Sequence, residues 1–304
     1  MNEIKIRLNR FVIRAIEFIE IVVGFFIVIK FLRIKKIQID SNSVFDSCDS
    51  EFGILMHGPI LIKQDFTFET LLLYLRKYPN VKILLSTWSD LPIHYVKKFE
   101  SLNITLLLNE KPIFSGKSNV NFQILSTNAG INKLRDLGVK YVLKTRTDQR
   151  IYNDSNYLKY LKNIILKDPP VSGFLKRKLV VTNLNMFKNR LYTISDMFMF
   201  GKIDDISFFW DVPYQKKQSS DSSDYLNPDF PTAEGYIVNN FINKINYKPK
   251  NTLSDSFKFI CSNFIVIDHA SLEVFWYKYN HIFLKKSFIV DEKVDTNYSI
   301  FNQV

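Results

Sequence analysis

The sequence predicts an α/β fold in which a mostly parallel central sheet is flanked by helices. From Phe52 onward, short apolar runs of strand length alternate with segments that have the 3.6-residue periodicity of helices. Turn and capping residues separate these segments, and regular β-α-β alternation is typical of parallel sheets. Hydrophobic residues make up 46% of the 304 residues and charged residues 23%, which is the composition of a globular protein with a buried core.

The region before residue 151 has the more regular pattern. The expected strands are the apolar runs 52–56, 81–86, 104–108 and 141–144. Asp65 or Thr67 can cap a first helix, which Pro79 ends. A second helix is expected to begin at Thr127, with Gly138 suited to the position after its last turn.

The second half of the chain is less regular. The expected elements are a strand at 197–200, a helix at 203–210, a helix at 232–244 and a strand at 264–267. Residues 213–231 are polar and rich in turn-forming residues. A segment of that length without periodicity is either a loop over a site or a solvated excursion.

Residues 4–36 are expected to form a basic amphipathic helix with a narrow polar stripe. The stripe consists of Arg7, Arg10, Arg14, Glu17 and Glu20. The uninterrupted apolar run at 21–29 is less than half of the about 20 residues that a spanning helix needs. Such a helix suits the anionic cytoplasmic leaflet of a membrane, and packing on its own domain is the alternative. We therefore expect a membrane-associated helix in residues 1–45 and a globular domain in residues 46–304.

The charge and the metal-binding residue types narrow the choice of partners only partly. The net charge of +11 favours acidic partners, which include nucleoside diphosphates, anionic lipids and nucleic acids. The two cysteines, Cys48 and Cys261, are expected to be reduced thiols without metal-ligand spacing. Of the four histidines, we interpret His57, His94 and His281 as structural. His269 follows Asp268 at the end of a strand and is a weak candidate metal ligand.

The densest polar cluster comprises residues 144–150. It begins at the last residue of the strand at 141–144 and continues through an expected polar loop at 145–150. In parallel sheets, ligands bind beyond the carboxyl ends of the strands. Arg146 and Arg150 can meet phosphate oxygens bidentately, and Asp148 between them can orient a metal or a ribose. The alternative is a cluster of surface salt bridges that ends the strand.

Two later motifs offer carboxylates. Asp196 precedes the strand at 197–200, where it either faces a substrate hydroxyl or, with Ser195, forms the turn that enters the strand. Glu234 opens the helix at 232–244, where it either complements the helix dipole or acts as a general base. No neighbouring residue distinguishes the functional from the structural interpretation of Glu234.

These motifs, in this order, resemble the WavE lipopolysaccharide synthesis family over roughly residues 52–280. The resemblance is carried by Gly58-Pro59-Ile60, Leu85-Ser86-Thr87-Trp88, Ser126-Thr127 with Gly130-Ile131, residues 140–150, residues 195–201 and Glu234-Gly235-Tyr236. It implies a GT-A-like glycosyltransferase, and the basic helix expected at 4–36 would hold such an enzyme at the inner face of the bacterial inner membrane. The acceptor would be a saccharide or lipid-linked saccharide of lipopolysaccharide, lipooligosaccharide or capsule.

The resemblance also implies roles for individual residues. The nucleotide-sugar donor would be bound by Gly58, Pro59, Ser86, Thr87, Trp88, Arg146, Asp148 and Arg150. Asp196 would lie on the acceptor side and Glu234 would be the base. Asp148 would take the place of the metal-binding Asp-x-Asp motif, but Arg146 stands two positions before it. The requirement for a divalent cation, Mn or Mg, therefore stays open.

Two other functions are compatible with parts of the sequence. A nucleotidyltransferase acting on a phospho-sugar would use the same strand-end pocket but needs a glycine-rich phosphate loop, which Gly58 alone supplies poorly. A non-catalytic, membrane-associated nucleic-acid-binding protein would place aromatic side chains among basic ones on its surface. Here the aromatic residues fall mostly within expected strands and helices, so we expect no nucleic-acid partner.

Overall fold

The computed structural model describes residues 50–277, apart from 154–155, 172, 185, 187–189, 217–231 and 270–271. The segment 4–36, Cys48, His281 and most of the loop 213–231 lie outside the described residues. Within the described part, no helix combines the length and the apolar character that crossing a membrane requires.

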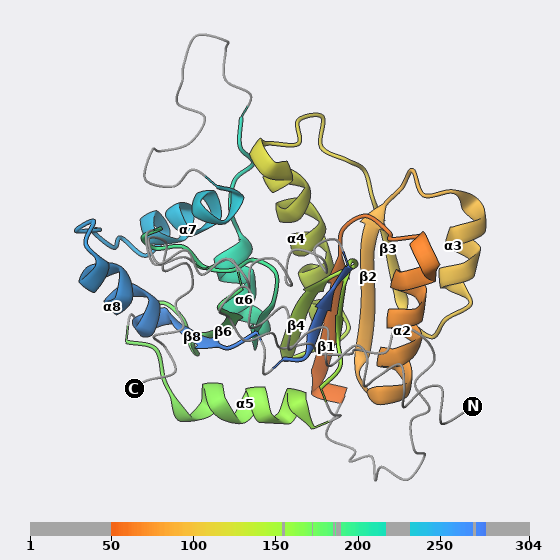
Figure 1. Ribbon diagram of the computed structural model, residues 1–304, viewed down its shortest axis with the longest axis horizontal. Coiled ribbons are helices and arrows are strands. Elements are labelled where there is room, and N and C mark those ends of the chain that lie inside the picture. Colours follow the sequence, from red (N-terminus) through yellow and green to blue (C-terminus); the bar gives the residue numbers. More distant parts are fainter. Residues whose placement is uncertain are drawn as a thin grey trace, which may run out of the picture.

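A seven-stranded sheet forms the centre of the molecule, in the order β3-β2-β1-β4-β7-β6-β8 (Figure 1). Its strands are β1 (Phe52–His57), β2 (Lys82–Trp88), β3 (Thr105–Asn109), β4 (Tyr141–Arg146), β6 (Leu179–Thr182), β7 (Met199–Lys202) and β8 (Phe264–Ile267). Only β7 runs antiparallel to its two neighbours in this sheet. The prediction of a mostly parallel α/β sheet is confirmed.

Helices cover both faces of this sheet. The helices are α2 (Phe66–Lys77), α3 (Ile93–Glu100), α4 (Val120–Asp136), α5 (Tyr157–Lys167), α6 (Ile203–Trp210), α7 (Ala233–Lys244) and α8 (Leu253–Asn263). Successive side chains of a strand point to opposite faces. Leu55 accordingly packs in one apolar cluster with α4, α6, α7 and α8, while Ile54 and Met56 pack in another with α2, α3 and α5. Burial on both faces explains why the strands read as continuous apolar runs.

Helix α4 lies unusually close to β1 because Gly130 has no side chain. A Cβ atom at Gly130 would come within 2.3 Å of Leu55 Cδ1, so any larger residue must displace the helix or the leucine. The approach brings the first turns of α4, including Ser126, next to the carboxyl end of β1.

The expected elements match the observed ones best where the pattern is local. The elements at 203–210 and 264–267 have the predicted bounds. Helix α4 begins at Val120 rather than at Thr127, and Asp65 occupies the N-cap of α2 without a side-chain hydrogen bond to the first turn of that helix.

The expected polar loop after β4 is mostly strand. Arg146 ends β4, and β5 (Gln149–Ile151) pairs antiparallel with β9 (Val274–Trp276). Only Thr147 and Asp148 connect β4 to β5. The partner strand β9 lies far along the chain, so no local pattern indicated this pairing.

Candidate functional site

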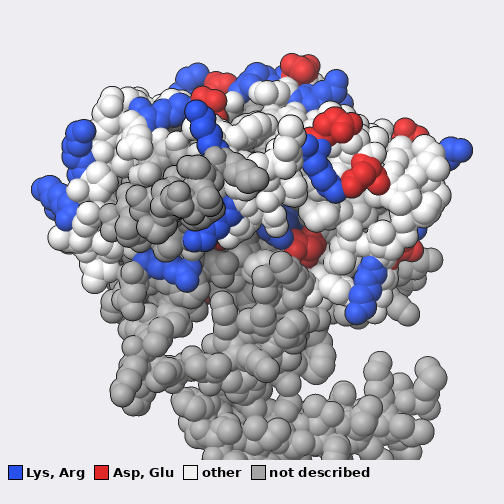
Figure 2. Space-filling model, turned by 90° about the horizontal axis from the view of Figure 1, so that it is seen from above, with Lys and Arg blue, Asp and Glu red and all other residues white. Residues whose placement is uncertain are grey.

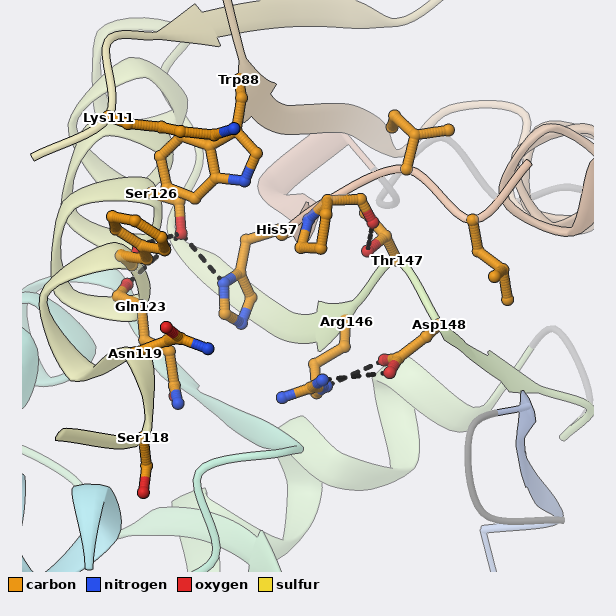
Figure 3. A pocket seen from close by; sticks show the side chains of 15 residues that line it. His57, Trp88, Lys111, Ser118, Asn119, Gln123, Ser126, Arg146, Thr147 and Asp148 are labelled. Atoms are coloured by element: carbon orange, nitrogen blue, oxygen red, sulfur yellow. Dashed lines mark hydrogen bonds and ion pairs between the residues drawn. The ribbon is translucent and has the colours of Figure 1, made fainter. Parts of the chain in front are cut away.

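A cavity of about 580 Å³ lies beyond the carboxyl ends of β1, β2 and β4. It is lined by the end of β1 and the turn after it, by Trp88 at the end of β2, by the first turns of α4, and by residues 146–148 (Figure 3). This is the position at which parallel sheets bind ligands. Gly58, Pro59, Trp88, Arg146 and Asp148, all predicted to bind the donor, line it.

The turn after β1 is held against residues 146–148. Gly58 has a φ of +116°, which side-chain-bearing residues rarely adopt, and a Cβ there would lie 3.2 Å from Thr147 Oγ1. The Thr147 hydroxyl donates to the Pro59 carbonyl at 2.6 Å, and the Thr147 N–H donates to the His57 carbonyl at 3.2 Å. The two lining segments therefore form one rigid wall.

Arg146 and Asp148 form a bidentate ion pair on this wall. Arg146 Nε donates to Asp148 Oδ1 at 2.8 Å and Nη2 donates to Oδ2 at 3.0 Å. Trp276 Nε1, from β9, donates to the same Oδ2 at 3.1 Å. Burial alone would raise the pKa of Asp148, but the hydrogen bonds and charge of Arg146, together with the Trp276 N–H, hold that pKa below its usual value.

A second polar cluster joins residues from three separate motifs: Lys144, Asp196 and Glu234. Lys144 is fully buried in β4, its Nζ donates to the backbone carbonyl of Asp196, and it lies 4.3 Å from the centre of the Trp210 ring. Burial lowers the pKa of Lys144 to about 7, although the carboxylates of Asp196 and Glu234 oppose that shift.

Glu234 shares this environment. Its pKa is raised by burial and by the neighbouring Asp196 carboxylate, against hydrogen bonds from its own N–H and the Thr232 hydroxyl and the charge of Arg190. The local geometry follows from the N-cap of α7, where Thr232 Oγ1 accepts from the Gly235 N–H at 3.1 Å. A carboxylate whose pKa is raised is a better proton acceptor at neutral pH than an ordinary glutamate.

His57 lies between the cavity and this second cluster. It is 3% exposed, and Nδ1 lies 3.1 Å from Ser126 Oγ. The pKa of His57 lies well below its usual value because the ring is buried and because Lys144 and Arg146 place positive charge nearby. The imidazole is therefore neutral at physiological pH.

Residues 54–295 match the model of the WavE lipopolysaccharide synthesis family. The chain belongs to this family. No curated protein sequence matches it.

Several solved structures share part of the fold at low identity. TarS from S. aureus is 14% identical with a TM-score of 0.35, over 53% of this WavE family chain and only 30% of the TarS chain. A 4-diphosphocytidyl-2C-methyl-D-erythritolsynthase from Anaerococcus prevotii is 11% identical with a TM-score of 0.41, covering 78% and 96% of the two chains. Mouse xyloside xylosyltransferase 1 is 8% identical with a TM-score of 0.34, covering 72% and 84%. All three TM-scores lie below 0.5, so we infer function from the family and from the site residues themselves.

The donor atoms around Asp148 in this WavE protein do not fit a resident divalent cation. Mn or Mg would need several oxygen ligands, but both Asp148 oxygens accept from Arg146 or Trp276. His269 Nδ1 lies 2.9 Å from Asn183 Oδ1 and outside the cavity lining. Across the described ranges, no group of three or more His, Cys, Asp or Glu could hold a metal ion. Neither Asp148 nor His269 therefore belongs to a complete set of protein ligands in the described part of the chain, and a cation held jointly by Asp148 and donor phosphates stays a prediction.

Arg150 corrects the predicted phosphate-binding set. Its Nε donates to Thr70 Oγ1 at 2.9 Å, and its Nη2 donates to the Phe66 carbonyl at 3.1 Å. Its guanidinium also lies 4.5 Å from the centre of the Phe66 ring. Arg150 is 3% exposed and fastens α2 to β5, so it does not line the cavity.

Ser86 and Thr87 are also buried rather than lining the cavity. Ser86 Oγ donates to the Ser126 carbonyl at 2.7 Å and accepts from Asn109 Nδ2 at 2.9 Å. Ser86 therefore positions α4, and of the predicted Ser86-Thr87-Trp88 trio only Trp88 reaches the cavity.

Sequence reasoning missed two residues that the structure of this WavE protein brings to the site. His57 was interpreted as structural, although it directly follows an apolar strand and precedes the Gly58-Pro59 turn. Lys144 was grouped with the polar cluster, but a lysine inside a buried strand was the available signal. For both residues, the signal is the position relative to an apolar strand rather than the residue type alone.

Proposed function

We propose that this chain is a glycosyltransferase that moves a sugar from a nucleotide-sugar to a saccharide of lipopolysaccharide, lipooligosaccharide or capsule. One observation carries the proposal: a cavity lined by aromatic side chains and Arg146 lies at the strand ends, and His57 on its wall is near Lys144 of the Lys144–Asp196–Glu234 cluster. Membership of a lipopolysaccharide synthesis family supports the choice of acceptor.

The cavity suits the nucleotide part of the donor. Its volume of about 580 Å³ lies in the range of small-molecule sites. Trp88 and Phe122 have ring centres 5.1 Å apart, and aromatic faces of this kind stack on nucleobases. Arg146 borders the same cavity, where a guanidinium can neutralise charge that develops on the leaving diphosphate.

The Asp196–Glu234 pair suits the acceptor. In the proposed reaction, Glu234 removes the proton from an acceptor hydroxyl, whose oxygen attacks the anomeric carbon of the donor. The bond from that carbon to the diphosphate oxygen breaks, and the nucleoside diphosphate leaves with the electron pair. A single displacement inverts the anomeric configuration. The raised pKa of Glu234 supports its role as base.

On the face that Figure 2 shows, the charge distribution of the described residues gives no support to a polynucleotide partner. Figure 2 shows Lys and Arg interspersed with Asp and Glu over the visible face rather than gathered into one stripe. Several exposed lysines are neutralised by ion pairs, such as Lys176 with Asp204 and Lys244 with Asp211. Proteins that bind nucleic acids concentrate basic residues on one face. We keep membrane attachment through residues 4–36, at the inner face of the inner membrane, as part of the proposal.

The test is a turnover assay on the full chain with a panel of nucleotide-sugars and a lipopolysaccharide or lipooligosaccharide acceptor. Release of a nucleoside diphosphate is expected. In a parallel reaction with nucleoside triphosphates and sugar 1-phosphates, release of pyrophosphate would indicate nucleotidyl transfer instead. Glu234→Gln should lower kcat by about a hundredfold or more with nucleotide affinity kept, since a general base contributes roughly that much. The matched control is Glu100→Gln, at the exposed end of α3. Full activity of a folded Glu234→Gln protein would remove Glu234 as the base.

A further inference from the structure

The Ser126 hydroxyl decides which nitrogen of His57 carries the hydrogen. Ser126 Oγ donates to the Phe122 carbonyl, four residues earlier in α4, at 2.8 Å. A carbonyl oxygen can only accept, so the single hydroxyl hydrogen is used there. Ser126 Oγ must then accept from His57 Nδ1, 3.1 Å away. The neutral imidazole therefore has its hydrogen on Nδ1 and a lone pair on Nε2.

That lone pair faces the cavity without a partner. Among the residues that the structure describes, His57 Nε2 has no hydrogen-bond partner although the side chain is buried. In Figure 3, Nε2 points away from Ser126 into the space bordered by Asn119 and Arg146. A buried acceptor left unpaired is unfavourable, and a bound group that donates a hydrogen bond would recover that loss.

The neighbours of Nε2 limit what that donor can be. Phosphate oxygens are acceptors, so they would meet the lone pair unfavourably and are better placed at Arg146. His57 is instead linked through Ser126 to the turn of α4 that carries Phe122, whose ring lies beside Trp88. The aromatic rings and the lone pair thus line the same cavity, which suits a base that is stacked on rings and read at its edge.

We propose that His57 Nε2 selects the nucleobase of the donor by accepting a hydrogen bond from a ring N–H on its pairing edge. Uracil and thymine have such a hydrogen at N3, and guanine has one at N1. Cytosine N3 and adenine N1 carry lone pairs, which would face the lone pair of Nε2. This inference rests on the proposed function, because it assumes that the cavity holds the nucleotide.

Two substitutions separate the contacts of His57. In His57→Asn the amide reaches the position of Nδ1, so the contact with Ser126 is kept and the Nε2 acceptor is lost. In His57→Gln an amide oxygen can take the place of Nε2. The control is His94→Asn on the exposed face of α3, outside the cavity lining.

The experiment is calorimetric titration of the full chain with UDP, dTDP, GDP, CDP and ADP. Wild type should bind the best of the first three about tenfold or more tightly than CDP and ADP, which corresponds to ~1.4 kcal/mol. His57→Asn should lose most of this ratio, His57→Gln should keep the affinity for the preferred base, and His94→Asn should match wild type.

The outcomes distinguish this inference from the proposed function. Binding without base preference, tighter binding of CDP or ADP, or an unchanged ratio in folded His57→Asn overturns the base-reading role and leaves the transferase proposal standing. Weaker binding of dTDP than of UDP, without a preference among the four ribonucleotides, would assign Nε2 to a ribose hydroxyl instead. If no nucleotide binds the folded wild type, both proposals fail.

A measurement on wild type covers the case in which the variants do not fold. Imidazole ¹⁵N spectra of the free protein should show His57 protonated on Nδ1 alone, and the Nε2 signal should shift when the preferred nucleotide is added. A hydrogen on Nε2 in the free protein would overturn the inference.

Discussion

Replacing Gly130 by alanine tests whether the close approach of α4 to β1 positions the site. A Cβ at this position would lie 2.3 Å from Leu55 Cδ1, 3.0 Å from Cδ2 and 3.2 Å from Cγ. Leu55 is fully buried in the sheet, so it cannot simply turn into solvent. Overpacking of a core costs about 1–3 kcal/mol, whereas alanine gains up to ~1 kcal/mol over glycine inside a helix. We expect a net loss of up to about 2 kcal/mol in the free energy of unfolding.

Urea unfolding of wild type, Gly130→Ala, Leu55→Ala and the double variant measures this effect. Leu55→Ala alone should cost about 2–5 kcal/mol, because it leaves a cavity. In that background, Gly130→Ala should be neutral or stabilising, so the coupling between the two substitutions should be at least about 1 kcal/mol. The displaced helix should also weaken nucleotide binding, because α4 carries Ser126 and Phe122. A Gly130→Ala protein as stable as wild type, without coupling to Leu55, would refute the reasoning.

Four further variants test individual contacts. Arg150→Met should lower the free energy of unfolding by about 2 kcal/mol in urea titration, because Thr70 and the Phe66 carbonyl lose a charged donor, yet leave the nucleotide Kd unchanged. Trp276→Phe should remove one hydrogen bond to Asp148, costing about 1 kcal/mol and raising the pKa of that carboxyl in NMR titration. Thr232→Ala should cost about 1 kcal/mol in thermal unfolding, because the N-cap of α7 is lost; Thr232→Ser should keep it. Lys144→Met should abolish a pH dependence of the free energy of unfolding. Folding lowers the pKa of Lys144 from 10.5 to about 7, so between these pH values the unfolded chain binds a proton that the folded chain lacks. The stability of wild type should therefore rise with pH over this range. A wild-type stability that stays flat or falls between pH 7 and 10 would contradict that last expectation.

The helix α4 shows where local pattern was misleading. The sequence predicts that this helix begins at Thr127, and hydroxyl side chains such as those of Thr127 and Ser126 are common at N-caps. In the structure they lie inside α4, and Ser126 bonds back to the carbonyl of Phe122. The sequence is compatible with a helix start at these residues and with a helix interior, because a hydroxyl can accept from a free N–H at an N-cap or donate to the carbonyl four residues earlier. Packing of the longer helix against β1 selected the second.

The two arginines of one motif show the same limit for the site. Arg146 and Arg150 looked equivalent, because each flanks Asp148 at a strand end. Pairing of β5 with β9 and the position of α2 turn Arg150 into the core, while Arg146 stays on the cavity wall.

By itself the sequence determined the alternation of strands and helices, the parallel sheet and the edge of that sheet at which polar residues gather. These follow from the hydrophobic periodicity of each segment and from the regular alternation of strands with helices, which are both local features of the chain. It also marked Asp196 and Glu234 as carboxylates worth testing. Only the tertiary structure placed these two carboxylates near Lys144 and directed Nε2 of His57 towards the cavity. It also formed the hydrogen bond from Trp276 to Asp148. Those contacts join residues far apart in the chain, and side-chain orientation there depends on which elements pack together rather than on any local pattern.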